Sequence, residues 1–309
     1  MNAETGLSRR ALLAGGTLAL ASCTPPKSIL VHEHILVDFA GAELASRSRY
    51  SHDEVIAAAK PKLQAIAKLG CVRFVDCTPN FLGRDPRLLA KLAESCGIEI
   101  WTNTGLYAAG AYRYLPSYAR TESARELAAR WIAEWRNGIE GTKPHFIKIG
   151  VNDGPLAELD RKMVEAAAIT SLETGLTIAS HTGRNAAPEQ MEMLLKLKLP
   201  MNKFIWVHAQ NEKNHQIHAE VARAGAWVEF DGISPKTLDW HQDCVEFMAK
   251  EKLLGRVLLS QDSGWWHVGE DNGGNFRGYD SIYRDFLPKL DPKWRTQLLW
   301  DNPRSAFSV

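Results

Sequence analysis

Short apolar runs and longer amphipathic segments alternate along most of the 309-residue chain. Eight short runs have the length and composition of buried strands: 28–31, 72–77, 98–102, 145–149, 176–180, 203–207, 226–230 and 257–260. Apolar residues at helical spacing fill the segments between them: 53–69, 87–95, 121–137, 160–174, 188–197, 215–224 and 239–252. Eight strands alternating with helices predict an α/β fold, a single-domain (β/α)8 TIM barrel over residues 29–309.

Residues that can bind a metal stand at the ends of five of these apolar runs. They are His32, His34, Lys148, His181, His208 and Asp262. Alternate residues of a strand point to the same side, so His32 and His34 can bind one ion together. Because the active sites of α/β barrels lie at the carboxyl ends of the strands, we expect all six side chains to converge at one mouth.

The first residues have the pattern of an export signal. Arg9 and Arg10 precede an apolar stretch, 11–21, that is too short to span a bilayer. We interpret residues 1–22 as a cleavable signal peptide of the twin-arginine type and 23–28 as a short linker. Cys23 follows Leu-Ala-Ser, as in a bacterial lipobox, and would carry a lipid; the alternative is a plain cleaved signal. Both interpretations predict a periplasmic protein, and only the lipobox interpretation gives it a membrane contact, through the lipid on Cys23.

Composition excludes some classes of partner. The formal net charge is +1, which gives no electrostatic reason to expect binding to nucleic acid.

The four cysteines after Cys23 lack the paired spacing of a zinc knuckle or redox motif, and free buried thiols are the simpler interpretation. They are Cys71, Cys77, Cys96 and Cys244.

The ordered motifs of the chain resemble the phosphotriesterase family of the amidohydrolase superfamily, which includes phosphotriesterase-like lactonases and esterases. The resemblance covers essentially the whole mature chain, through the motifs at 31–34, 83–85, 104–107, 146–150, 180–183, 207–209, 259–262 and 302–304. It implies two divalent metal ions, with zinc the expected metal, and Lys148 carboxylated to N6-carboxylysine as the bridge between them. By the same resemblance, His32, His34 and Asp262 bind the more buried ion, and His181 and His208 bind the more exposed one.

The implied reaction is hydrolysis. A hydroxide bridging the two ions attacks a carboxylic ester or lactone, and Asp262 takes its proton and passes it to the leaving group. Lys148 fits this chemistry only as a modified residue, because a lysine ammonium is a donor-only cation that would repel the metals. A metal- or ligand-binding lipoprotein without catalysis is the alternative from another class.

The substrate pocket is less well defined. Tyr107 matches a pocket position of the family, and the glycine-rich segment 264–278 carries Trp265, Trp266 and His267, a composition suited to a mobile wall over a small apolar substrate. These aromatic residues could equally pack the barrel rim.

Two positions depart from the organophosphate-hydrolysing members of the family. Their proton relay places an aspartate and a histidine where this chain has Asn211 and Gly232. Asp231 is retained and could hydrogen-bond the substrate or a histidine that lies outside the set of metal ligands. The incomplete relay favours an ester or lactone substrate, with a phosphotriesterase (aryldialkylphosphatase) acting on organophosphates as the alternative.

Two further expectations concern the rest of the molecule. The other helix-borne or strand-start histidines, His52, His145, His215, His218 and His241, are predicted to lie at the surface. Dimers are common among the relatives, so a homodimer is one expected state.

Overall fold

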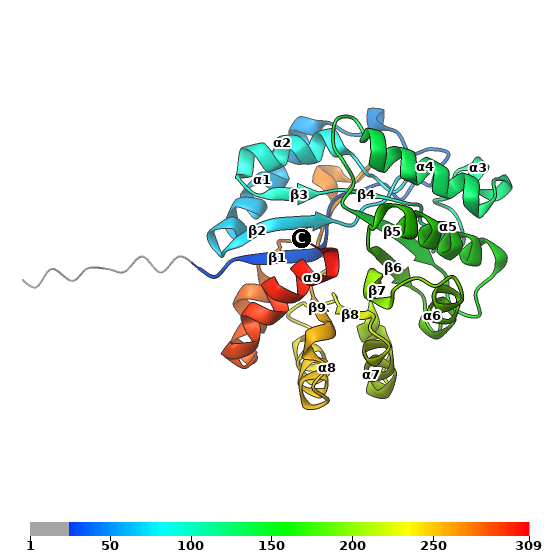
Figure 1. Ribbon diagram of the computed structural model, residues 1–309. Helices are drawn as coiled ribbons and strands as arrows, with labels where there is room; N and C mark the ends of the chain where they lie inside the picture. The colour runs from blue at the N-terminus through cyan, green and yellow to red at the C-terminus, as the bar shows by residue number, and fades with distance from the viewer. Residues whose placement is uncertain (1–24, 309) are drawn as a thin grey trace, which may run out of the picture.

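The computed structural model describes residues 25–308, which form parallel strands surrounded by helices (Figure 1). The signal peptide expected over 1–22 and Cys23 lie outside these residues. Within 25–308 the strands are β1 Ser28–Val37, β2 Cys71–Asp76, β3 Glu99–Trp101, β4 Asn103–Thr104, β5 Phe146–Val151, β6 Ile178–Thr182, β7 Phe204–Val207, β8 Trp227–Phe230, β9 Val257–Leu259 and β10 Gly264–His267.

All strand pairings are parallel, in the orders β10-β1-β2-β3 and β4-β5-β6-β7-β8-β9. The two sheets continue into one another, because their edge strands β3 and β4 are consecutive in the chain and separated only by Thr102. At the other seam, His34 N donates to Ser263 O at 2.9 Å, and Asp262 N donates to His32 O at 3.1 Å. This parallel α/β arrangement agrees with the predicted eight-stranded barrel.

The helices cover the outside of the strands. They are α1 His52–Lys68, α2 Pro86–Cys96, α3 Ser117–Thr121, α4 Ala124–Asn137, α5 Glu158–Thr174, α6 Ala187–Lys196, α7 His215–Arg223, α8 Leu238–Lys250 and α9 Asn302–Phe307. Short 3-10 turns occupy Arg47–Arg49, Met201–Lys203, Ala209–Asn211, Leu254–Arg256, Asp271–Gly273, Leu287–Lys289 and Pro292–Trp294, and π turns occupy Ile282–Phe286 and Gln297–Asp301. No helix within 25–308 is long and apolar enough to cross a membrane.

Four predicted elements differ from the structure. The strand expected over 28–31 continues to Val37, so His32 and His34 lie within β1 rather than after it. The helix expected over 121–137 begins at Ala124 instead, because Ser123 forms a capping box with Glu126, and Thr121 is the last residue of the short α3. The third strand is divided into β3 and β4. The segment 264–278, expected as a loop, starts with a strand, because Gly264–His267 pairs with β1 and extends the eighth strand.

The surface prediction for the histidines is wrong in two cases. His218 and His241 are buried, whereas His52, His145 and His215 are half-buried. The two buried rings stand on the inner faces of α7 and α8, and each donates a hydrogen bond to a backbone carbonyl, His218 to Ala209 O and His241 to Thr237 O. The four cysteines are free thiols, as predicted; the predicted burial is confirmed for Cys71, Cys77 and Cys244, whereas Cys96 is half-buried.

Candidate metal centre

All six predicted ligand side chains line one cavity of about 230 Å³. His32, His34, Lys148 and His181 stand on β1, β5 and β6, whereas His208 and Asp262 follow β7 and β9. His208 and Asp262 have left-handed backbone conformations, with φ of 64° and 46°. Such a conformation is uncommon outside glycine and is often found at functional sites. The strand ends thus bring together residues that are up to 230 positions apart in sequence.

The rings and the carboxylate lie at distances suited to shared ions. The His181 and His208 ring centroids are 4.5 Å apart, and that of His32 is 5.2 Å from His208 and 5.4 Å from His34. Asp262 Oδ1 lies 3.2 Å from His34 Nε2 and 3.8 Å from His32 Nε2. One ligand atom each from His32, His208 and Asp262 falls within 4.8 Å of the others. This donor set of imidazole and carboxylate suits zinc and other divalent transition metals.

Each of three ligand histidines is oriented through its Nδ1 atom. His32 Nδ1 donates to Glu229 Oε1 at 2.6 Å, and His208 Nδ1 donates to Asp231 Oδ1 at 2.7 Å. His34 Nδ1 lies within hydrogen-bond distance, 2.8 Å, of Thr78 Oγ1. Engaging Nδ1 leaves Nε2 as the atom available to a metal, which is the usual way proteins orient such ligands.

Glu33, between the two histidines, points to the opposite side of β1. Its carboxylate accepts hydrogen bonds from Ser260 Oγ at 2.8 Å, Gln261 N at 3.1 Å and Ser263 N at 2.8 Å. Burial raises the pKa of Glu33 to about 8. The residue therefore joins β1 to the end of the eighth strand at the point where the metal-facing residues meet.

Burial and neighbouring charges shift the pKa values in this cluster. Burial, followed by the nearby Lys148 charge, lowers the pKa of His32 to about 3, and burial with the adjacent His208 lowers that of His181. For Asp262, burial alone would raise the pKa, but the facing His34 and His32 hold it well below its usual value. His32 and His181 are thus neutral and Asp262 is ionised at neutral pH, which are the protonation states that metal binding requires of these three residues.

Glu229 and Asp231 form a tightly coupled buried pair behind His32. Burial and the adjacent Asp231 raise the pKa of Glu229, whereas His208 and His32 outweigh burial and lower that of Asp231. A single negative charge on Asp231 is therefore the favoured state of the pair.

The surroundings of Lys148 test whether this chain fits two metal ions bridged by a carboxylated lysine. The residue is 2% exposed, and Nζ has no hydrogen-bond partner among the described residues. A buried ammonium without a partner is costly. Asp262 Oδ1 is likewise buried without a hydrogen bond. A carboxylated Lys148 with cations between it, Asp262 and the histidines would pair both atoms, so the residues present fit two divalent ions.

Aromatic side chains form the walls of the same cavity, among them Phe39, Tyr107, Tyr114 and Trp265. Tyr107 lies against β5 at Gly150, where a Cβ atom would come within 2.5 Å of its ring. Of the other expected pocket residues, Asp231 is wholly buried behind His208, Trp266 packs under Gly273 and Phe276, and His267 lies beside Phe39; all three are outside the cavity lining.

The two positions that depart from the organophosphate-hydrolysing pattern are filled differently. Asn211 is exposed. A Cβ atom at Gly232 would lie 2.8 Å from Gln210 Nε2 and 3.3 Å from His241 Nε2. Gln210 Nε2 donates to Asp231 Oδ1 at 2.7 Å. Gln210 and His241 therefore occupy the space that a side chain at 232 would take.

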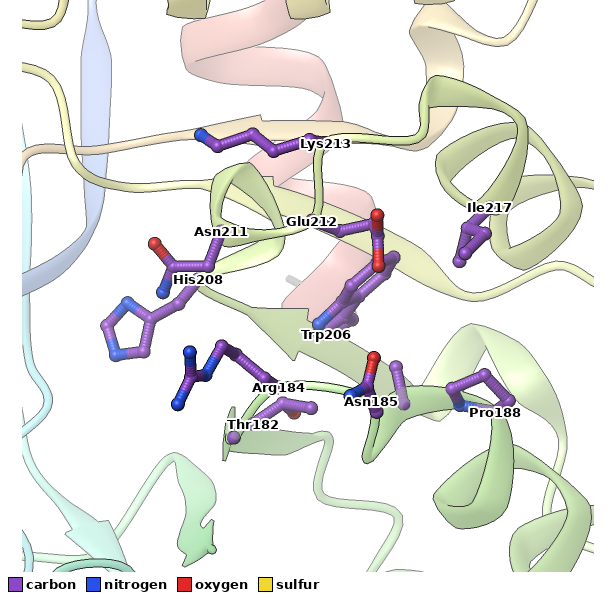
Figure 2. A pocket seen from close by; sticks show the side chains of 12 residues that line it. Thr182, Arg184, Asn185, Pro188, Trp206, His208, Asn211, Glu212, Lys213 and Ile217 are labelled. Carbon is purple, nitrogen blue, oxygen red and sulfur yellow. The ribbon is translucent and has the colours of Figure 1, made fainter. Parts of the chain in front are cut away.

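A second cavity of about 310 Å³ adjoins the first at His208. Figure 2 shows that its sides come from the segment after β6, with Thr182 and Arg184, and from the segment after β7, with Glu212 and Lys213. Trp206 lies between these two sides.

Glu229 and Thr78 are site residues that sequence reasoning missed. Glu229 stands on β8, and Asp231 directly follows that strand. Because the two residues are two positions apart, their carboxylates point to the same side. A charged residue inside an apolar run was the signal available in the sequence.

The chain is similar to several known proteins. It is 25% identical to the phosphotriesterase homology protein of Escherichia coli over 300 residues, covering 93% of this chain and 99% of that protein. It is 25% identical to the aryldialkylphosphatase of Saccharolobus solfataricus over 280 residues, covering 88% and 85% of the two chains. A lactonase structure from Listeria monocytogenes, 22% identical, has the same fold with a TM-score of 0.78 over 92% of this chain and 95% of its own.

The match to a protein-family model covers most of the chain. Residues 20–307 match the model of the phosphotriesterase family, a span that holds every strand of the barrel and all six residues at its mouth. The chain therefore belongs to the phosphotriesterase family.

Proposed function

We propose that the protein is a metal-dependent hydrolase of carboxylic esters or lactones, with two divalent ions, zinc the expected metal, held by His32, His34, Lys148, His181, His208 and Asp262. The observation that carries this proposal is the convergence of all six on one cavity, with Lys148 Nζ buried and unpaired among them. Family membership supports the hydrolase part of the proposal, because the relatives include an aryldialkylphosphatase, whereas the ester or lactone part rests on the cavity.

Some residues of the site would bind the metal ions, and Asp262 would also transfer a proton. When bound, the metal ions would supply Lewis-acid chemistry, lowering the pKa of water at the site and polarising the substrate oxygen. Lys148, as N6-carboxylysine, would hold both ions. Asp262 Oδ1 faces the cavity and is positioned to accept a proton from the attacking water and return it to the leaving group.

The cavity favours a small substrate. Its volume of about 230 Å³ is below the range of ordinary drug-sized sites, roughly 300–1,000 Å³. The aromatic walls, including Tyr107 and Trp265, suit the apolar part of an ester or lactone ring. A phosphotriester places three substituents around its phosphorus atom and needs more space, so organophosphates are the second candidate, favoured by the aryldialkylphosphatase relative.

The test is a hydrolysis panel of lactones, aryl esters and phosphotriesters with the metal-loaded protein, wild type and Lys148→Ala. We expect lactones or esters to give the highest kcat/KM and Lys148→Ala to lose at least 10²-fold, partly restored by added acetate or propionate, which replace the missing carboxylate. A phosphotriester preferred by orders of magnitude would overturn the substrate assignment. Turnover at the wild-type rate by Lys148→Ala, without added acid, would overturn the role of Lys148.

We also propose that the protein is exported to the periplasm, with Cys23 as the lipid-bearing residue. The twin arginine at Arg9 and Arg10 and the small residues before Cys23 support this.

A further inference from the structure

A second group of metal-ligating side chains lies outside the barrel mouth, between α7 and α8, which run side by side in Figure 1. His215 and His218 are one turn apart on α7, and Cys244 stands on the facing side of α8. Their ligand atoms all lie within 4.8 Å of one another. None of the three lines the cavity that holds the catalytic candidates.

The hydrogen bonds of the two rings fix their tautomers. His218 Nε2 lies 2.8 Å from Ala209 O, and His215 Nε2 lies 2.9 Å from Asp243 Oδ2. A carbonyl and a carboxylate can only accept, so each Nε2 carries the ring hydrogen and each neutral ring keeps a lone pair on Nδ1. The two Nδ1 atoms nevertheless face each other at 3.4 Å. Two lone pairs at this distance repel unless a cation lies between them.

We propose that His215 Nδ1, His218 Nδ1 and Cys244 Sγ form a structural binding site for a soft divalent cation, with zinc the best match. Bonds of about 2.05 Å at a tetrahedral angle separate two zinc-bound nitrogens by about 3.4 Å, which is the Nδ1 separation observed here. On binding, the Cys244 S–H bond ionises, its proton leaves to solvent and the thiolate coordinates the ion. The fourth position of the ion is open to water.

The surroundings hold these ligands in place. The His215 ring stacks between Trp240 and Phe247, at centroid distances of 4.9 and 4.8 Å. His218 and Cys244 are wholly buried, whereas the His215 side chain is 20% exposed and provides the entry route. Burial lowers the pKa of His218 to about 4, so this ring is neutral at neutral pH and its Nδ1 lone pair is available to a metal.

An ion here would stabilise the segment that carries His208. His218 binds the carbonyl of Ala209, the residue directly after His208, and Trp240 Nε1 donates to Gln210 O at 2.9 Å. Both helices thus hold the backbone that follows β7. The ion would join α7 to α8 and thereby fix this segment from behind, without contacting the substrate.

The first test is the zinc content of the full chain after loading with Zn²⁺ and removal of free metal. We expect Cys244→Ser to hold one zinc per chain less than the wild type, while Cys96→Ser, a matched change at a half-buried cysteine outside the cluster, holds the wild-type amount. The ions at the barrel mouth are common to all three proteins, so the difference reports the second site alone. Equal zinc in Cys244→Ser and wild type would overturn the proposal.

The second test identifies the ligands directly. With Co²⁺ in place of zinc, a thiolate ligand gives a charge-transfer absorption band, and we expect Cys244→Ser to lose it. Cys77→Ser must retain the band, because Cys77 lines the catalytic cavity and is the other thiol near a proposed metal. His215→Gln should also lose one zinc. A His215→Gln protein with full zinc content would show that a shared proton, rather than a metal, lies between the rings.

Discussion

Glu229 on β8 contacts His32 on β1, and the two residues are 197 positions apart. Its Oε1 atom accepts the Nδ1 hydrogen of His32 at 2.6 Å in a fully buried position. Through this bond Glu229 acts as a positioning residue, because it fixes the ring so that Nε2 faces the cavity.

We predict that Glu229→Ala weakens metal binding at the barrel mouth by about 10- to 100-fold, the usual cost of removing a group that orients a ligand. Glu229→Gln should recover most of the affinity, because its carbonyl oxygen still accepts from His32. Equilibrium metal titration measures both variants, and Glu246→Gln on the outer face of α8 is the matched control. Wild-type affinity in Glu229→Ala would contradict the positioning role.

Single residues also show how far the site could be predicted. The histidines, Lys148 and Asp262 were found because each follows an apolar run, and local sequence marks where a strand ends. Glu229 and Thr78 were missed because their partners, His32 and His34, lie on other strands. Their roles depend on which side chains face one another inside the barrel, and spacing along the chain does not specify that.

At the scale of elements, β10 sends its two tryptophans to opposite faces. Trp265 lines the catalytic cavity and lies 4.7 Å from the His34 ring. Trp266 is 8% exposed and packs against Gly273 and Phe276. This follows from the alternation of side chains along a strand.

We therefore predict separate effects for two neighbouring substitutions. Trp265→Ala should raise KM for aryl esters or lactones several-fold and change stability little, because it removes cavity wall. Trp266→Ala should lower the free energy of unfolding by about 3–5 kcal/mol, the usual cost of truncating a buried large aromatic residue. Urea denaturation and steady-state kinetics measure the pair. Equal losses of stability in both would contradict the assignment of faces.

The helices and strands differ in how well the sequence predicts them. The alternation of strand and helix was predictable because both periods are strong, and most boundaries lie within two residues of those expected. The break before α4 was also present in the sequence, as the capping pattern of Ser123 and Glu126. Gly264–His267 could not be predicted as a strand, because glycine and its neighbours favour a loop locally and only pairing with β1 makes the segment extended.

At the scale of the whole molecule, the two ends of the barrel differ in composition. The catalytic candidates lie at the carboxyl ends of the strands, whereas α9 covers the opposite end. Phe307 of α9 packs edge-on against Trp101 and Phe146, both at 5.7 Å. Substitutions at that end are thus expected to act on stability and those at the mouth on activity.

The proposed export of the protein gives a third prediction. Replacing Arg9 and Arg10 with lysine should retain the protein in the cytoplasm, because the twin arginine is the recognition element of that export route. Cell fractionation with immunoblotting measures the distribution. Cys23→Ala should still be exported but be released from the membrane fraction, and full periplasmic recovery of the double-lysine variant would contradict the proposed route.

The bond between Glu33 and Ser260 links positions 227 residues apart. Because Glu33 separates His32 from His34, the ligand pair takes its final position only when the last strands meet the first. Contacts between such distant segments form late, since the entropy of closing the intervening chain must be overcome first. The proposed metal would therefore bind at the mouth only after the strands farthest apart in sequence have paired, and its uptake during refolding would report the completion of that pairing.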